Sequence, residues 1–183
     1  MKATENENEG VLSTHLHADG TDAEKLMFEN PGCHGGVHKS EDKLYDFDED
    51  EPEFGGAFTT KKMMANESYA PHMEGPAVFK FAVKKFPEVI MESLTANGKT
   101  PEDLDLLVPH QANLRINQFV QAMLKLPDEK VFNNIQKYGN TTAASIPIAL
   151  SEAWEAGKVK EGDLICLAAF GSGFTWAAAL LKW

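Results

Sequence analysis

The chain has few cysteines and no long apolar run. Its 183 residues include only two cysteines, Cys33 and Cys166, which are far apart and exclude a disulfide-rich scaffold or a four-cysteine zinc site. No run approaches the roughly 18 apolar residues of a membrane-spanning helix. The polar residues 1–9 lack the apolar core of a signal peptide. We therefore expect reduced thiols, a cytoplasmic location and no membrane contact.

An excess of positive charge is also missing. The formal net charge is -11, and residues 1–53 hold 15 Asp and Glu against 4 Lys, whereas residues 54–183 hold 13 charges of each sign. Such a chain is not expected to bind nucleic acid, whose phosphates attract basic surfaces. The densest acidic block, residues 41–53, belongs to a Gly-rich and acidic stretch at about 31–62. We interpret this stretch as a solvated insertion.

The remaining sequence has the size and pattern of one α/β domain, since 183 residues that are 43% hydrophobic suffice for one core. Alternating and short apolar runs predict strands, and apolar residues spaced three and four apart predict helices. The predicted strands cover residues 10–17, 104–108, 131–133, 164–170 and 174–183, and the predicted helices cover residues 76–96, 113–126 and 143–156. This order predicts a mixed five-stranded sheet with right-handed crossovers and an antiparallel last strand.

The predicted helices do not protect the whole sheet. The helix at 113–126 should bury one apolar stripe, made of Ile116, Phe119, Val120, Met123 and Leu124. We expect the helices to cover one face of the sheet and nothing in this chain to cover the other face. Small residues in the last strand favour close packing there, so a partner or a missing half is expected on that face.

Polar groups follow three of the predicted strands. His110 comes directly after the strand at 104–108, Asn140 lies between the strand at 131–133 and the next helix, and Gly171, Ser172 and Gly173 follow the strand at 164–170. The carboxyl ends of parallel strands meet at one edge of a sheet, where open α/β sheets build their sites. An imidazole, a carboxamide and backbone amides would then converge. Together they suit an oxygen that becomes negative during acyl chemistry.

Two groups of residues could instead suggest a metal site. His15 and His17 are two residues apart in the first predicted strand and therefore share one face of it. Cys33, His34 and His38 lie in a Gly-rich loop. The histidine pair lacks a clear carboxylate or thiolate as third ligand, and the loop group is a second weak candidate. We therefore expect no metal.

Three segments resemble β-ketoacyl-acyl carrier protein synthase III. They are VPHQANLRI at 108–116, YGNTTAASIP at 138–147 and AFGSGFTW at 169–176, and the likeness extends back to STHLHADG at 13–20. This resemblance implies a thiolase-like fold. It also implies that residues 1–183 form the second βαβαβαββ half of that fold, interrupted by the acidic insertion.

The resemblance implies roles for the polar strand ends. His110 and Asn140 match the family's catalytic His and Asn, which donate hydrogen bonds to the malonyl thioester carbonyl as CO2 leaves. The Ser172 amide matches an oxyanion donor, at a position where the family more often has glycine. Five further residues match positions at the CoA or carrier-protein entrance or in the tunnel that binds the substrate: Asn113, Arg115, Gly75, Phe79 and Phe170.

One element of the family's site has no counterpart in this sequence. The family's nucleophile is a cysteine at the start of a buried helix in the first half of the fold, and neither Cys33 nor Cys166 occupies such a place. The resemblance therefore implies that the cysteine comes from an N-terminal half, which is either a separate chain or missing.

The implied reaction is the decarboxylative condensation of acyl-CoA with malonyl-acyl carrier protein in fatty acid biosynthesis, without a cofactor. The implied partners are the N-terminal half, acyl carrier protein, acyl-CoA and a second copy of the complete unit, as a homodimer. Two alternatives remain open. One is a non-catalytic subunit that binds acyl carrier protein or completes another ketosynthase, and the other is a fragment without function.

Overall fold

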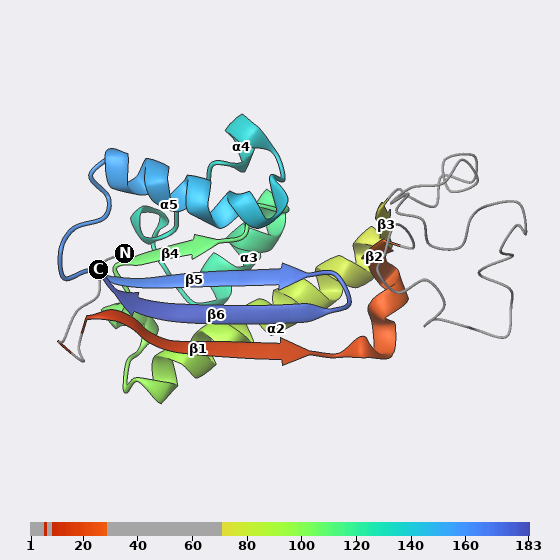
Figure 1. Ribbon diagram of the computed structural model, residues 1–183, viewed down its shortest axis with the longest axis horizontal. Helices are drawn as coiled ribbons and strands as arrows, with labels where there is room; N and C mark the ends of the chain where they lie inside the picture. The colour runs from red at the N-terminus through yellow and green to blue at the C-terminus, as the bar shows by residue number, and fades with distance from the viewer. Residues whose placement is uncertain (1–5, 7–8, 29–70) are drawn as a thin grey trace, which may run out of the picture.

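A mixed four-stranded sheet organises the described part of the chain, which comprises Asn6, residues 9–28 and residues 71–183 of a computed structural model (Figure 1). In spatial order its strands are β1 (Gly10–Ala18), β6 (Thr175–Lys182), β5 (Leu164–Gly171) and β4 (Leu106–Pro109). β4 and β5 are parallel, whereas β6 is antiparallel to both of its neighbours. β4 and β5 therefore end at one edge of the sheet, as predicted, and β1, which the prediction did not include, ends at the same edge. The predicted acidic insertion at about 31–62 lies outside the described residues.

The fifth strand predicted at 131–133 is a single parallel bridge between Val131 and Leu107. The chain thus still runs beside β4 in the expected direction. Pairing ends there because the N–H groups of Asn134 and Ile135 donate to the side-chain oxygen of Gln111 instead of to a neighbouring strand. A two-stranded sheet that the sequence analysis did not predict joins β2 (Leu26–Phe28) to β3 (Pro71–Met73).

Helix α2 (Gly75–Ala96) covers one face of the sheet (Figure 1). Pro76 lies in its first turn, where a missing N–H costs no helical hydrogen bond, and Pro87 is buried within it. Gly98 ends the helix with φ +63°, and its N–H donates to the carbonyl of Thr95. This left-handed cap is the one predicted at Asn97 and Gly98.

Helix α5 (Ser145–Glu155) packs on the other face, so the prediction that nothing in this chain covers that face was wrong in part (Figure 1). Ala149 and Ala153 of α5 are fully buried against Leu106, Val108 and Ile165, because small residues let the helix approach β4 and β5 closely.

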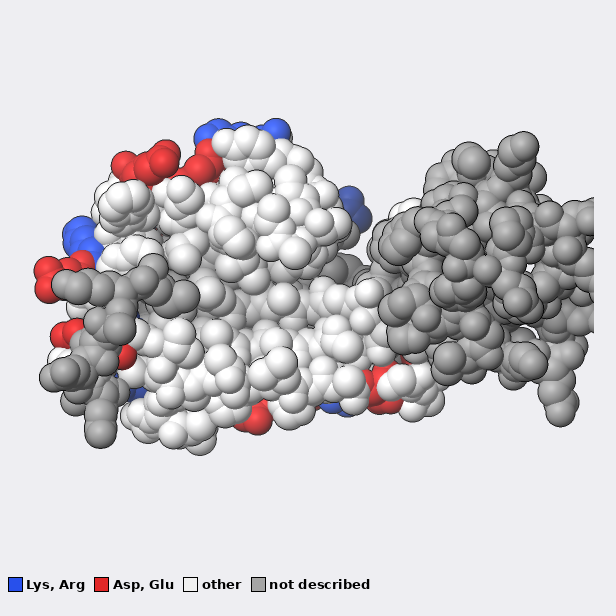
Figure 2. All heavy atoms as spheres, viewed as in Figure 1, with Lys and Arg blue, Asp and Glu red and all other residues white. Residues whose placement is uncertain are grey.

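The area beside α5 stays uncovered by the described residues. We call it the open face and define it by Leu16, Ala169, Ala177 and Ala179. Leu16 on β1 and Ala169 on β5 both pair with Ala177 on β6, and Ala179 lies two residues further along β6 on the same face. The side chain of Leu16 is 74% exposed. Figure 2 shows no charged side chain over the centre of this face.

Helix α3 (Leu114–Met123) packs on α2 with Ile116, Val120 and the following Leu124 buried, but Phe119 and Met123 are 42% and 59% exposed. The predicted stripe was therefore wrong for these two residues. The buried side of the helix is turned toward Asn117, which is 1% exposed and donates a hydrogen bond to Asn133. A polar residue inside the packed face was not anticipated.

Short helices connect the main elements. They are η1 (Gly20–Lys25), η2 (Pro101–Asp103), η3 (Asp128–Lys130), α4 (Ile135–Tyr138) and η4 (Thr142–Ala144). None of the helices in the described ranges is long and apolar enough to cross a membrane.

Candidate active site

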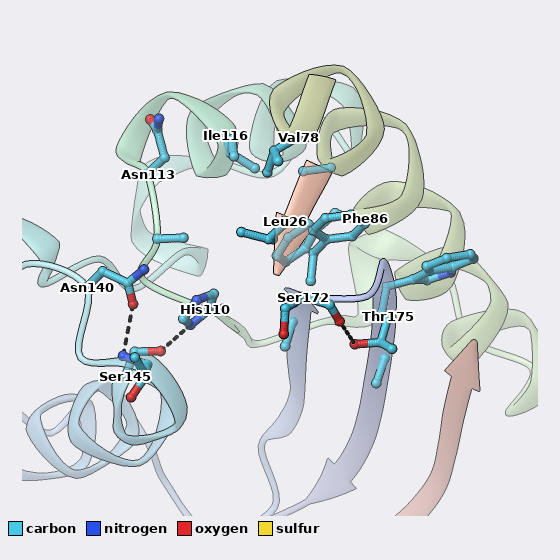
Figure 3. A pocket seen from close by; sticks show the side chains of 18 of the residues that line it. Leu26, Val78, Phe86, His110, Asn113, Ile116, Asn140, Ser145, Ser172 and Thr175 are labelled. Atoms are coloured by element: carbon cyan, nitrogen blue, oxygen red, sulfur yellow. Dashed lines mark hydrogen bonds between the residues drawn. The ribbon is translucent and has the colours of Figure 1, made fainter. Parts of the chain in front are cut away.

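A cavity of about 1020 Å³ lies at the edge of the sheet where the parallel strands end. Its walls include His110, Asn140 and Ser172, the three residues predicted to converge (Figure 3). In the view of Figure 3, His110 lies between Asn140 and Ser172. Leu16, Ala169 and Ala177 also line the cavity, so it is continuous with the open face.

His110 is positioned by the end of β4. Its backbone N–H donates to the carbonyl of Ala168 on β5 at 2.8 Å, which extends the pairing of the two strands to the histidine. The imidazole Nδ1 lies 2.5 Å from the hydroxyl of Ser145, and Nε2 has no partner among the described residues. Burial disfavours the charged ring and lowers the pKa of His110 below its ordinary value. The imidazole is therefore neutral near neutral pH.

Gln111, which the sequence analysis did not single out, fixes the segment beside His110. Its side chain is 1% exposed and donates to the carbonyls of Pro109 at 2.7 Å and Phe132 at 3.3 Å. Its oxygen accepts from the N–H groups of Asn134 at 3.0 Å and Ile135 at 3.2 Å. One buried amide thus joins the end of β4 to the start of α4, which leads to Asn140.

Asn140 follows a residue with a backbone conformation that only glycine adopts readily, since Gly139 has φ +68° and ψ −157°. Two residues after Asn140, Thr142 also has a positive φ, of +51°. The Oδ1 atom of Asn140 accepts a hydrogen bond from the Thr142 N–H at 2.9 Å. This bond leaves the Nδ2 amide as the group available to a ligand, with no partner in the described part of the chain.

Glu152 on α5 anchors the helix that precedes this turn. Its carboxylate accepts hydrogen bonds from Lys137 at 2.8 Å, Tyr138 at 2.6 Å and Asn134 at 2.8 Å. These three donors lower the pKa of Glu152 to about 2. The sequence analysis missed this role, because the donors lie 14 to 18 residues before the carboxylate and form no local motif.

The turn at 171–173 joins β5 to β6 and contains Ser172, the third predicted donor. Gly173 has φ +73°, and its N–H donates to the carbonyl of Leu26 at 3.0 Å. The Ser172 carbonyl accepts from the Thr175 hydroxyl at 3.2 Å, whereas the Ser172 N–H has no acceptor in the ranges that the structure describes (Figure 3).

The five predicted binding residues divide into two groups. Asn113 and Phe170 line the cavity, and Asn113 also caps α3 by accepting from the Arg115 N–H at 2.9 Å. Arg115, Gly75 and Phe79 are not among the residues that line it. Arg115 is exposed in the first turn of α3, Gly75 is the first residue of α2, and Phe79 packs against the core.

The described residues contain no group of three or more His, Cys, Asp or Glu side chains that could hold a metal ion. His15 and His17 lie on one face of β1, as predicted, and both contact Glu92 on α2, at 3.1 Å and 2.6 Å. Cys33, His34 and His38 lie outside the described residues. Cys166 is fully buried in β5, and burial raises the pKa of its thiol to about 12, so it is not a nucleophile.

The sheet order, the antiparallel strand between parallel ones and the donors at one edge define a thiolase-like half. A protein-family model described as "3-Oxoacyl-[acyl-carrier-protein (ACP)] synthase III C terminal" matches residues 94–183. A β-ketoacyl-[acyl-carrier-protein] synthase III from Caldanaerobacter subterraneus is 40% identical over 179 residues, which are 95% of this chain and 46% of the relative. The chain belongs to the β-ketoacyl-[acyl-carrier-protein] synthase III family and corresponds to the C-terminal half of its members.

Solved structures agree with this assignment. The 3-oxoacyl-[acyl-carrier-protein] synthase III of Aquifex aeolicus is 38% identical with a TM-score of 0.76, over 99% of this chain and 46% of that one. The synthase III of Thermus thermophilus is 39% identical with a TM-score of 0.74, over 97% and 47% of the two chains. The chain thus spans a little under half the length of these relatives.

Proposed function

We propose that this chain provides the oxyanion-binding half of a synthase III active site. The reaction is the decarboxylative condensation of acyl-CoA with malonyl-acyl carrier protein in fatty acid biosynthesis. The observation that carries the proposal is that His110 and Asn140 line one cavity, while His110 Nε2 and Asn140 Nδ2 are both unpaired among the described residues. The similarity to relatives named β-ketoacyl-[acyl-carrier-protein] synthase III supports the substrate class.

The chemistry needs donors rather than a base. When malonyl thioester loses CO2, the electron pair of the breaking carbon–carbon bond forms an enolate, and negative charge develops on the thioester oxygen. In our proposal His110 and Asn140 donate to that oxygen, and the enolate carbon then attacks the acyl thioester. The Ser172 N–H donates to the oxyanion of the resulting tetrahedral intermediate, which collapses to the β-ketoacyl product as the carbon–sulfur bond breaks and the cysteine leaves as thiolate. Preorganised donors in a cavity of this kind supply the stabilisation, and no cofactor is required.

The acyl thioester requires a cysteine from outside the described residues, because Cys166 is buried and protonated. We propose that an N-terminal half provides this cysteine, whether as a separate chain or as part of the same one. The open face is the proposed contact surface for that half. It is uncharged at its centre, it exposes Leu16, and it is continuous with the cavity (Figure 2).

The substrates are proposed to enter beside α3. Arg115 is the only arginine of the sequence, and its exposed position next to Asn113 suits a phosphate of CoA or an acidic carrier protein. Gly75, Phe79 and Phe170 are proposed to line the substrate tunnel once the other half is in place. The complete unit is proposed to be a homodimer in the cytoplasm, where a free thiol such as Cys166 stays reduced.

Reconstitution tests the proposal. The chain is mixed with the N-terminal half of a relative that carries the cysteine, and malonyl-dependent CO2 release and condensation are measured. We expect turnover, and we expect His110→Ala and Asn140→Ala each to lower kcat by about 100-fold, the usual effect of removing one oxyanion donor. Asn97→Ala is a matched control, because this amide lies at the end of α2 and bonds Ser13 outside the cavity.

The result also separates the proposed enzyme from a non-catalytic subunit. A chain that binds the N-terminal half and acyl carrier protein but gives no CO2 release in any such mixture would contradict the proposal.

A further inference from the structure

A buried hydroxyl lies against the imidazole of His110. Ser145 is the first residue of α5, is 1% exposed, and places Oγ 2.5 Å from Nδ1 of His110 (Figure 3). The serine belongs to the segment 138–147 on which the family resemblance rests, yet neither that resemblance nor the sequence pattern gave it a role.

The hydrogen-bond count around Ser145 determines which way its proton points. The backbone N–H of Gln111 donates to Ser145 Oγ at 3.3 Å, so one lone pair of the hydroxyl is occupied. The hydroxyl proton then needs an acceptor, and a buried donor without one is costly. Among the described residues, Nδ1 of His110 is the only acceptor within hydrogen-bond distance of Oγ.

We propose that Ser145 donates to Nδ1 of His110 and thereby fixes the neutral imidazole as the tautomer with its proton on Nε2. This inference deepens the proposed function and rests on it, because only the Nε2–H tautomer can donate to the enolate oxygen. Ser145 is a positioning residue, since it acts through the histidine and does not touch the reacting atoms.

The opposite tautomer would oppose the reaction. A neutral imidazole carries one N–H. With the proton on Nδ1, the Nε2 lone pair would face an oxygen that gains negative charge, and the two would repel each other. A protonated ring would have N–H groups at both nitrogens, and Nδ1 could no longer accept from Ser145. The serine therefore favours the neutral form, in the same direction as the burial that lowers the pKa of His110.

One stretch of chain thus controls both donors. Asn140 lies at its start, where the Thr142 N–H orients the amide, and Ser145 lies five residues later, where α5 begins. A shift of α5 relative to β4 would change the amide and the tautomer together.

The tautomer can be measured without turnover. The side-chain ¹⁵N shifts of His110 in the 183-residue chain report which nitrogen is protonated and are followed across a pH titration. In the wild type we expect Nε2 protonated and Nδ1 unprotonated at neutral pH. In Ser145→Ala we expect a mixture of both tautomers and a higher pKa for His110. Ser93→Ala is the control, because it removes another fully buried serine hydroxyl, on α2, which bonds Ile90 and not the histidine.

The reconstituted enzyme gives a second readout. We expect Ser145→Ala to lower kcat about 10-fold with KM nearly unchanged. The tautomer of His110 affects the negative charge that develops in the transition state and not the binding of the uncharged thioester carbonyl. If Ser145→Ala does not fold, Ser145→Cys replaces it, because the larger thiol is a weak donor at the same position.

The inference would be overturned if His110 of the wild type carried its proton on Nδ1. It would also be overturned if neither the tautomer nor the pKa of His110 changed in Ser145→Ala. A wild-type chain with the expected tautomer but no turnover in reconstitution would instead contradict the proposed function and leave the Ser145 arrangement intact.

Discussion

At the scale of single residues, the site depends on backbone conformations that most side chains avoid. Gly139, directly before Asn140, has φ +68° and ψ −157°, a region that is almost restricted to glycine. The space around its Cα is open, since an added Cβ would meet no atom within 4 Å. Conformation alone, and not crowding, therefore requires glycine at this position.

We expect Gly139→Ala to lower the free energy of unfolding by about 1–3 kcal/mol, the usual cost of such backbone strain. The same strain should move Asn140 and reduce turnover in the reconstituted enzyme. Denaturant unfolding measures the first effect. Gly20→Ala is the matched control, because that glycine also has open space around it but no positive φ. Equal stabilities of the two variants would refute the strain argument.

At the scale of elements, α5 organises the cavity by contacts at both of its ends. Its first residue, Ser145, contacts His110, and Glu152 near its other end anchors α4 through Asn134, Lys137 and Tyr138. A rigid helix therefore fixes the distance between two loops that are not adjacent in the sequence.

The carboxylate contacts of α5 should make the stability of the chain depend on pH. The pKa of Glu152 is about 2 in the folded chain and 4.5 without these partners, so its contribution is complete above about pH 4.5 and disappears as the pH falls toward 2. We expect Glu152→Gln to lower Tm at neutral pH and to have progressively less effect below pH 4.5. Thermal unfolding across this range tests the prediction.

Glu161→Gln is the control for that experiment, because Glu161 is exposed and has no hydrogen bond or ion pair among the described residues. A Tm difference between Glu152→Gln and the wild type that stays constant from pH 6 to pH 2 would show that the linkage is absent.

What the sequence could predict depended on whether the signal was local. His110 after Pro109 and Asn140 after Gly139 were recognised because proline and glycine mark the ends of elements. Gln111, Ser145 and Glu152 were missed because each has partners 14 to 35 residues away, at Phe132, His110 and Tyr138, which only the folded chain brings close.

The same distinction explains the errors in the elements themselves. The stripe on α3 was displaced because the polar Asn117 is buried against Asn133, a contact that hydrophobic periodicity does not register. The fifth strand was overestimated because the side chain of Gln111 takes the N–H groups that would have continued it.

At the scale of the whole molecule, the open face should be the surface on which the N-terminal half binds. We expect Leu16→Glu to weaken that binding at least 10-fold, because an unpaired carboxylate would be buried in the contact. The fold of the chain itself should not change, since Leu16 is 74% exposed. Isothermal titration calorimetry with the N-terminal half measures the change in dissociation constant.

Met123→Glu is the matched control, because Met123 is also apolar and 59% exposed but lies on α3, which packs on α2. If both variants bind the N-terminal half as tightly as the wild type, the open face is not the contact surface.

The position of β6 between β1 and β5 has a consequence for how the chain folds during its translation. Gly10 pairs with Lys182 and Ala18 with Thr175, so the first strand of the sheet joins the others only through the last one. Contacts between segments this distant in sequence form slowly, because a long loop must close first. β1 therefore has no partner strand until Thr175–Lys182 have left the ribosome, and the sheet is completed only when β6 is available for pairing.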